Sequence, residues 1–112
     1  MPSTPRPAPV SARQMRAHAS EATQLLKALA NERRLMILCL LSEGEHSVGE
    51  LHAQLDLSQS ALSQHLAVLR QDGLVTTRRE AQVIHYGLAD GRARRIVETL
   101  HDMYCGIPGQ RT

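Results

Sequence analysis

Aromatic residues are almost absent from this chain of 112 residues, which has no tryptophan, no phenylalanine and two tyrosines. Aliphatic side chains, leucine above all, must therefore supply most of the packing of a hydrophobic core. The chain also lacks an uncharged apolar run of about 18 residues, the length needed to cross a membrane. Its first nine residues lack the apolar core of a signal peptide, so we expect a cytoplasmic protein without a membrane partner.

Strong charge of either sign is missing as well, because the formal net charge is only +2. This mild excess permits a nucleic-acid partner without requiring one. Cysteine is scarce, and the two that occur, Cys39 and Cys105, are far apart in the sequence. Cytoplasmic thiols ordinarily stay reduced, so we expect no permanent structural disulfide, whereas a transient or sensing one remains compatible with the sequence.

The length predicts one small domain with a modest core, for which dimerisation would add stability. Residues 1–14 contain four of the five prolines and are predicted to form a flexible arm. We assign residues 15–106 to the folded domain and residues 107–112 to a flexible tail.

Apolar residues at helical spacing predict a first helix from Met15 to Leu29. Asn31 is placed to cap a second helix that ends near Gly44. Residues 35–41 of this second helix are apolar throughout, so we expect it to be buried on more than one side.

A short third helix and a fourth helix follow, separated by a tight turn. Ser47 and Glu50 match a capping box, in which each side chain binds a free backbone amide at a helix start. Residues 56–57 form the turn, and Ser58 is placed to cap the fourth helix. Two short helices joined in this way predict a helix-turn-helix.

The fourth helix has one apolar stripe, made by Leu62, Leu66 and Leu69, which predicts its core-facing side. Hydrogen-bonding side chains with little charge occupy the rest: Gln59, Ser60, Ser63, Gln64 and His65. Amide and hydroxyl groups suit the edges of base pairs, so these residues and Ser58 are our candidates for contacts in a DNA major groove. An ordinary surface helix rich in serine and glutamine is the alternative.

After Gly73 the pattern becomes extended on both sides of the polar residues 79–82, which predicts a β-hairpin, or wing. Arg78 and Arg79 of this hairpin, and Arg70 near the end of the fourth helix, are placed to supply positive charge to the DNA backbone.

A last helix is expected to begin at Asp90 or Gly91, and its apolar face is formed by Ala93, Ile96, Val97, Leu100 and Tyr104. Neither this helix nor the first has an obvious partner in so small a core, so we expect both to pack against a second subunit. The predicted fold is thus mostly α with a small β-hairpin: a winged helix-turn-helix of order helix, helix, helix, helix, strand, strand, helix, dimeric through its first and last helices.

Three segments in this order resemble signatures of the ArsR/SmtB family of winged-helix repressors: LKALANERRL at 26–35, SQSALSQHL at 58–66, and GLV at 73–75 followed by RRE at 78–80. The resemblance covers roughly residues 20–105. It implies a homodimer that binds a double-stranded DNA operator with an inverted repeat, and no enzymatic activity. The wing tip departs from the family pattern, because Ala81 and Gln82 replace the common glycine and basic residue.

Most members of the family release DNA when a metal ion binds, but the residues that would form the known metal sites are missing. His52 and Gln54 stand where the third-helix site needs thiolates. In the last helix, Asp90 is followed by Arg92 in place of a histidine, and His101 lacks its second ligand. We therefore expect no metal site of these kinds.

Cys39 and Cys105 resemble the cysteine pair of a branch of the family that responds to reactive sulfur species or oxidants. Without the resemblance, Cys39 is better explained as an inert core residue. With it, the implied switch is a disulfide or polysulfide link between the two cysteines that releases the operator without a cofactor.

Three alternatives remain open at this point. The same thiolates could bind zinc, copper or arsenite in a metal-responsive repressor. A thiol oxidoreductase is poorly supported, because the chain has no Cys-x-x-Cys motif and no glycine-rich cofactor loop. The third alternative is a winged helix that binds other proteins and does not bind DNA.

Overall fold

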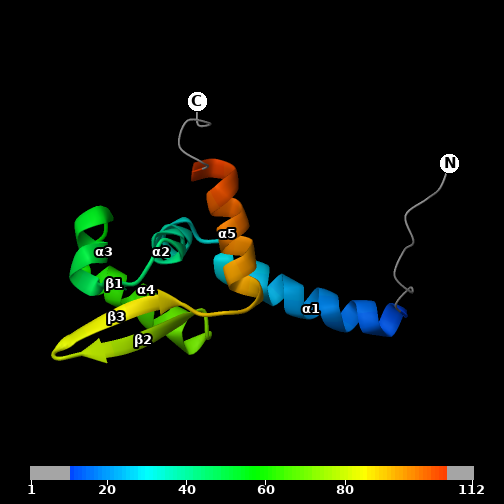
Figure 1. The fold of residues 1–112 in the computed structure, drawn as a ribbon. Coiled ribbons are helices and arrows are strands. Elements are labelled where there is room, and N and C mark those ends of the chain that lie inside the picture. The colour runs from blue at the N-terminus through cyan, green and yellow to red at the C-terminus, as the bar shows by residue number, and fades with distance from the viewer. Residues whose placement is uncertain (1–10, 106–112) are drawn as a thin grey trace.

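The computed structural model describes residues 11–105, which form five helices and a three-stranded antiparallel sheet (Figure 1). The elements in chain order are α1 (Ala12–Leu29), α2 (Glu32–Ser42), β1 (His46–Ser47), α3 (Val48–Gln54), α4 (Gln59–Gln71), β2 (Val75–Glu80), β3 (Val83–Leu88) and α5 (Arg92–Cys105). The predicted winged helix-turn-helix is confirmed, and the short strand β1 is an addition to the predicted order.

Helix α1 begins earlier than the apolar spacing predicts. Ser11 and Gln14 form a capping box, so the helix starts at Ala12 rather than at Met15. The remainder of the predicted arm, residues 1–10, and the predicted tail, residues 107–112, lie outside the described residues.

Helix α2 lies at the centre of the fold and begins as predicted. The Asn31 side chain accepts hydrogen bonds from the first free backbone amides of the helix. Ile37, Leu38 and Leu41 are buried, but Met36 is 46% exposed. The prediction that this helix is buried on more than one side is confirmed, because α1, α5 and β3 all pack against it, and Met36 marks the side that stays uncovered.

The helix-turn-helix has the predicted local signals. Ser47 and Glu50 form the capping box of α3, and the Ser58 hydroxyl caps α4. The three leucines of the α4 stripe are almost fully buried, with Leu62 at 0% exposure. The core also contains leucines of the neighbouring elements: Leu29, Leu51, Leu55, Leu74 and Leu88. This packing orients the opposite side of α4 toward solvent.

The sheet has the order β1-β3-β2, and its hairpin forms the wing, which extends away from the helices in Figure 1. The strands of the wing pair from Val75 with Leu88 to Glu80 with Val83. Residues 79 and 80 therefore belong to β2, and the tip is only Ala81 and Gln82, shorter than predicted. Strand β1 has two residues, too few to show a period of two in the sequence.

Helix α5 starts at Arg92, slightly later than expected, and packs against α2 within the same subunit. Val97 is fully buried and Ala93 nearly so. The last helix therefore has an intramolecular partner, contrary to our expectation. Tyr104 is 76% exposed because the end of α5 passes beyond the core. No helix between residues 11 and 105 has both the length and the hydropathy that a membrane crossing requires.

Candidate DNA-binding surface and cysteine pair

The exposed side of α4 carries most of the predicted DNA contacts. Gln59, Ser60, Ser63 and Gln64 are exposed, and Ser63 follows Gln59 by four residues and Ser60 by three, which puts these side chains on one side of the helix. His65 is half-buried at the margin of that face. The result is an uncharged surface of amides and hydroxyls that is held in place by the buried leucines behind it.

Ser58 has a structural role as well as the predicted one. Its hydroxyl oxygen accepts a hydrogen bond from the Ala61 amide at 3.1 Å, and its hydrogen remains available to donate to a phosphate. The first turn of α4 contains no acidic residue. The positive end of the helix dipole is therefore not neutralised by a carboxylate of the first turn, which favours an anion at this helix start.

The two arginines of the wing are in different surroundings. Arg78 donates hydrogen bonds to the Glu45 carboxylate, the shortest at 2.8 Å, and lies 3.3 Å from the Glu80 carboxylate. Hydrogen bonding to Arg78 lowers the pKa of Glu45, and the two carboxylates raise the pKa of Arg78. Arg79 and Arg70 are exposed and have no ion-pair partner within residues 11–105. Sequence reasoning missed Glu45, because nothing local links it to a residue of the wing.

The two cysteines lie where α2 and α5 pack together. Cys39 is in the last turns of α2, Cys105 is the last residue of α5, and both are half-buried thiols rather than a disulfide. Burial raises the pKa of Cys39, and the negative charge of Cys105 and of Glu43 raises it further. An electrostatic effect of this kind requires the cysteines to be neighbours, which their separation in the sequence did not by itself predict.

An ion pair beside the cysteines joins the same two helices. The His101 Nε2 of α5 lies 2.8 Å from the Glu43 carboxylate at the end of α2. In the sequence, His101 is notable only as an incomplete metal ligand, and no local pattern points to Glu43 as its partner. Within the described residues, no group of three or more histidine, cysteine or acidic side chains is arranged to hold a metal ion.

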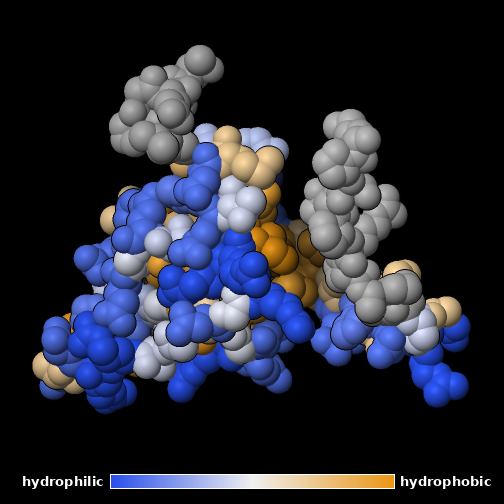
Figure 2. Space-filling model, turned by 45° about the vertical axis from the view of Figure 1, so that its right-hand side comes forward, coloured by the Kyte–Doolittle hydropathy of each residue, from blue (hydrophilic) through white to orange (hydrophobic). Residues whose placement is uncertain are grey.

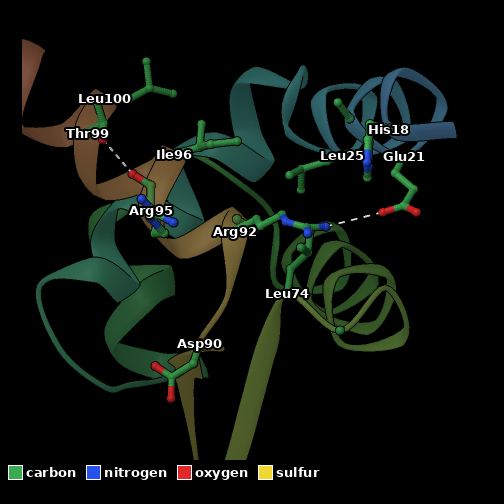
Figure 3. Close-up of a pocket in the computed structure, with 13 residues that line it drawn as sticks. His18, Glu21, Leu25, Leu74, Asp90, Arg92, Arg95, Ile96, Thr99 and Leu100 are labelled. Atoms are coloured by element: carbon green, nitrogen blue, oxygen red, sulfur yellow. Dashed lines mark hydrogen bonds and ion pairs between the residues drawn. The ribbon is translucent and has the colours of Figure 1, made fainter. Parts of the chain in front are cut away.

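A hydrophobic groove of about 940 Å³ separates α1 from α5. Figure 2 shows apolar surface inside this hollow, and Figure 3 shows Leu25 of α1 and Ile96 of α5 among the residues that line it. Arg92 and Glu21 form an ion pair of 3.4 Å between the two helices. Met15 and Leu26 of α1 are also exposed, at 57% and 56%. The first and last helices thus present uncovered apolar surface, as the sequence analysis expected of a dimer interface.

Comparisons with known proteins agree with this architecture. Residues 31–77 match the family described as "Bacterial regulatory protein, arsR family". The chain is 55% identical to the transcriptional activator HlyU of Vibrio cholerae over 98 residues, which cover 88% of this chain and 91% of that protein.

Solved structures of bacterial transcriptional regulators are also similar to this chain. The transcriptional repressor BigR of Xylella fastidiosa superposes with a TM-score of 0.82 at 42% identity, over 89% of this chain and 99% of that one. A DNA-binding domain from Mycobacterium bovis, described as homodimeric and winged helix-turn-helix, gives 0.67 at 32% identity, over 86% and 88% of the chains. The chain therefore belongs to the arsR family of bacterial regulatory proteins, and it is a winged-helix DNA-binding transcriptional regulator rather than an enzyme.

Proposed function

We propose that this protein is a homodimeric repressor that binds an inverted-repeat operator and releases it when Cys39 and Cys105 become linked by a disulfide or polysulfide. The observation that supports this function is the place of the two half-buried thiols on α2 and α5, which pack against each other, close enough for the charge of Cys105 to raise the pKa of Cys39. The signal is a small reactive sulfur species or an oxidant. Because its operator is DNA, the protein acts in the bacterial cytoplasm.

The dimer is proposed to form by pairing the apolar surfaces of α1 and α5 from two subunits. The groove between these helices and the exposed Met15 and Leu26 support this arrangement. Two copies of α4 would then enter successive major grooves about 34 Å apart. The candidates for base or phosphate contacts are the predicted residues Ser58, Gln59, Ser60, Ser63, Gln64, His65, Arg70, Arg78 and Arg79, of which Arg78 is already bound by Glu45 and Glu80. Repression follows if the operator overlaps a promoter and the bound dimer excludes the polymerase.

The linking reaction is ordinary thiol chemistry. A cysteine thiolate attacks the outer sulfur of a donor persulfide, becomes a persulfide itself and displaces the donor thiolate. The second cysteine thiolate attacks the inner sulfur of that persulfide, which forms the disulfide and releases hydrosulfide. If both cysteines carry an extra sulfur, attack of one persulfide on the other releases hydrosulfide and leaves a trisulfide. With peroxide, a sulfenic acid forms and then condenses with the other thiol, releasing water.

Linkage would change DNA affinity through the geometry of the dimer. A bond between the cysteines constrains α5, which belongs to the proposed interface, relative to α2, which lies in the core beneath the DNA-binding unit. The two α4 helices must meet both half-sites together, so a small change in their separation weakens binding. A coupling free energy of about 1–3 kcal/mol would lower the affinity by about 5- to 150-fold.

The experiment measures linkage and DNA binding on the same samples. The purified dimer is treated with polysulfide or peroxide, its mass is determined before and after reduction, and its affinity for the DNA upstream of its own gene is measured. We expect an intrasubunit link and loss of affinity, both reversed by reduction. The variants Cys39→Ser and Cys105→Ser should bind DNA and stay bound after treatment. Release of DNA by the double serine variant would contradict the proposed switch.

A further inference from the structure

Arg78 is held within the protein, although it lies on the wing of a DNA-binding fold. Its Nη2 and Nε atoms lie 2.8 and 3.0 Å from one carboxylate oxygen of Glu45, and its Nη1 atom lies 3.3 Å from Glu80. A guanidinium that already binds two carboxylates gains little from a phosphate, because these hydrogen bonds must first be broken. This arrangement differs from that of a phosphate-binding arginine.

The Glu45–Arg78 pair reaches across the sheet. Glu45 directly precedes β1, which pairs with β3, and Arg78 is in β2 on the far side of β3. The Glu45 side chain passes over β3 at Gly87, where an added β-carbon would lie 3.5 Å from the Glu45 Cγ and 3.3 Å from the Thr76 hydroxyl. The missing side chain at Gly87 therefore leaves the space through which Glu45 reaches β2.

Arg79 is on the other face of the same strand. Successive residues of a strand point to opposite faces, so Arg79 is directed away from the face shared by Arg78, Glu80 and Glu45. Arg79 is exposed, and no ion pair holds it within the part of the chain that the structure describes. Its charge is therefore available to a phosphate.

We propose that Arg78 is a positioning residue, which with Glu45 fixes the wing against the loop between α2 and β1 so that Arg79 meets the DNA backbone. The pair ties β2 to the residue before β1, at the level where Arg78 pairs with His85 of β3 and His85 pairs with Ser47 of β1. This role depends on DNA binding by the winged helix and does not depend on the cysteine switch.

A positioning role and a simple charge effect predict opposite changes in the DNA affinity of Glu45→Ala. Glu45→Ala removes a negative charge from a DNA-binding protein and frees Arg78, so an ordinary electrostatic effect would strengthen binding. If the pair positions the wing, the same variant should weaken binding. An exposed ion pair of this kind contributes little free energy, so we expect a loss of about two- to fivefold. Glu32→Ala removes an equal charge outside the wing and should leave binding unchanged or tighter.

The salt dependence of binding separates the two arginines. Removing an arginine that neutralises one phosphate lowers the slope of log affinity against log salt by about 0.9. Arg79→Gln should reduce this slope. Arg78→Gln should weaken binding and reduce the slope only while Arg79 is present, so adding it to Arg79→Gln should change the slope no further, whereas a direct phosphate contact by Arg78 would lower the slope in both backgrounds. The exchange Glu45→Arg with Arg78→Glu restores an ion pair without changing the net charge, and it should recover much of the affinity that Glu45→Ala removes.

These measurements use the full-length dimer and the DNA upstream of its own gene, with circular dichroism to check folding of each variant. Glu45→Ala binding as tightly as the wild type, or Arg78→Gln lowering the slope further in the Arg79→Gln background, would overturn the positioning role. Failure of the wild-type dimer to bind this DNA at all would instead contradict operator binding, and the positioning role with it.

Discussion

Cys39 combines partial burial with two negative neighbours, Cys105 and Glu43. Each of these disfavours the thiolate, which is the form that reacts with sulfur donors and alkylating agents. Cys39 is thus mostly protonated near neutral pH and gains reactivity only as the pH rises.

The raised pKa of Cys39 gives a prediction for its alkylation. The rate of reaction with iodoacetamide should keep rising beyond the pH at which an ordinary thiol, with a pKa of 9.0, is half ionised. In Cys105→Ser the rise should move to lower pH, because one source of negative charge is gone. Peptide mass spectrometry over a pH series measures both curves, and superimposable curves would contradict an electrostatic influence of Cys105 on Cys39.

Ser58 shows how one residue in a recognition helix can serve both stability and binding. Its hydroxyl caps α4, whereas Ser63 is exposed on the same helix and makes no cap. Ser58→Ala should lower the free energy of unfolding by about 1 kcal/mol. Ser63→Ala should change stability by less than about 0.5 kcal/mol and still weaken DNA binding. Urea denaturation and DNA titration separate the effects, and equal stability of the two variants would argue against the cap.

At the scale of elements, the loop between α2 and β1 joins three parts of the fold. Glu43 pairs with His101 of α5, and two residues later Glu45 pairs with Arg78 of the wing. Between them Gly44 has a φ of +149°, a conformation that a residue with a β-carbon rarely adopts. The turn at Gly44 thus lets the two acidic side chains beside it reach in different directions.

This geometry predicts opposite effects for two glycine substitutions. Gly44→Ala should destabilise the protein by about 1 kcal/mol or more, because alanine is strained at this φ. Gly49→Ala is the matched control, since it lies in α3 and its new β-carbon would meet only the Ser47 hydroxyl at 3.9 Å. It should stabilise the protein by about 0.4–1 kcal/mol. Thermal unfolding of both variants tests the pair, and an equally stable Gly44→Ala would show that the turn is not constrained.

At the scale of the whole molecule, α1 and α5 leave apolar surface uncovered in the isolated subunit. Leu26 is exposed on α1 and directly follows Leu25, which lines the groove, whereas Leu29 is buried in the core. Exposed leucine and methionine on one side of a small domain favour association, because pairing removes their surface from water.

Leu26→Glu should therefore separate the dimer without unfolding the subunit. The side chain is 56% exposed, so the substitution buries no charge within one chain. Light scattering should give the monomer mass, and operator affinity should fall by at least tenfold, because one α4 helix alone reads only half a site. Met36→Glu, at 46% exposure on α2, is the control that should remain dimeric. A dimeric Leu26→Glu would place the interface elsewhere.

Local patterns were sufficient to predict much of this protein. The caps at Asn31, Ser47 and Ser58, the leucine stripe of α4 and the hairpin all depend on residues a few positions apart, so the sequence alone determined them. The family was predictable for the same reason, because its signatures are contiguous segments.

The tertiary structure decided which distant residues meet. The pairing of Glu45 with Arg78, the two-residue strand β1 and the packing of α5 on α2 left no local pattern in the sequence. The sequence made Arg78 and Arg79 equivalent, and only the pairing of the strands separated a bound arginine from a free one. Burial and charge at Cys39 likewise come from residues of another helix, because the environment of a side chain is set by the elements that pack around it.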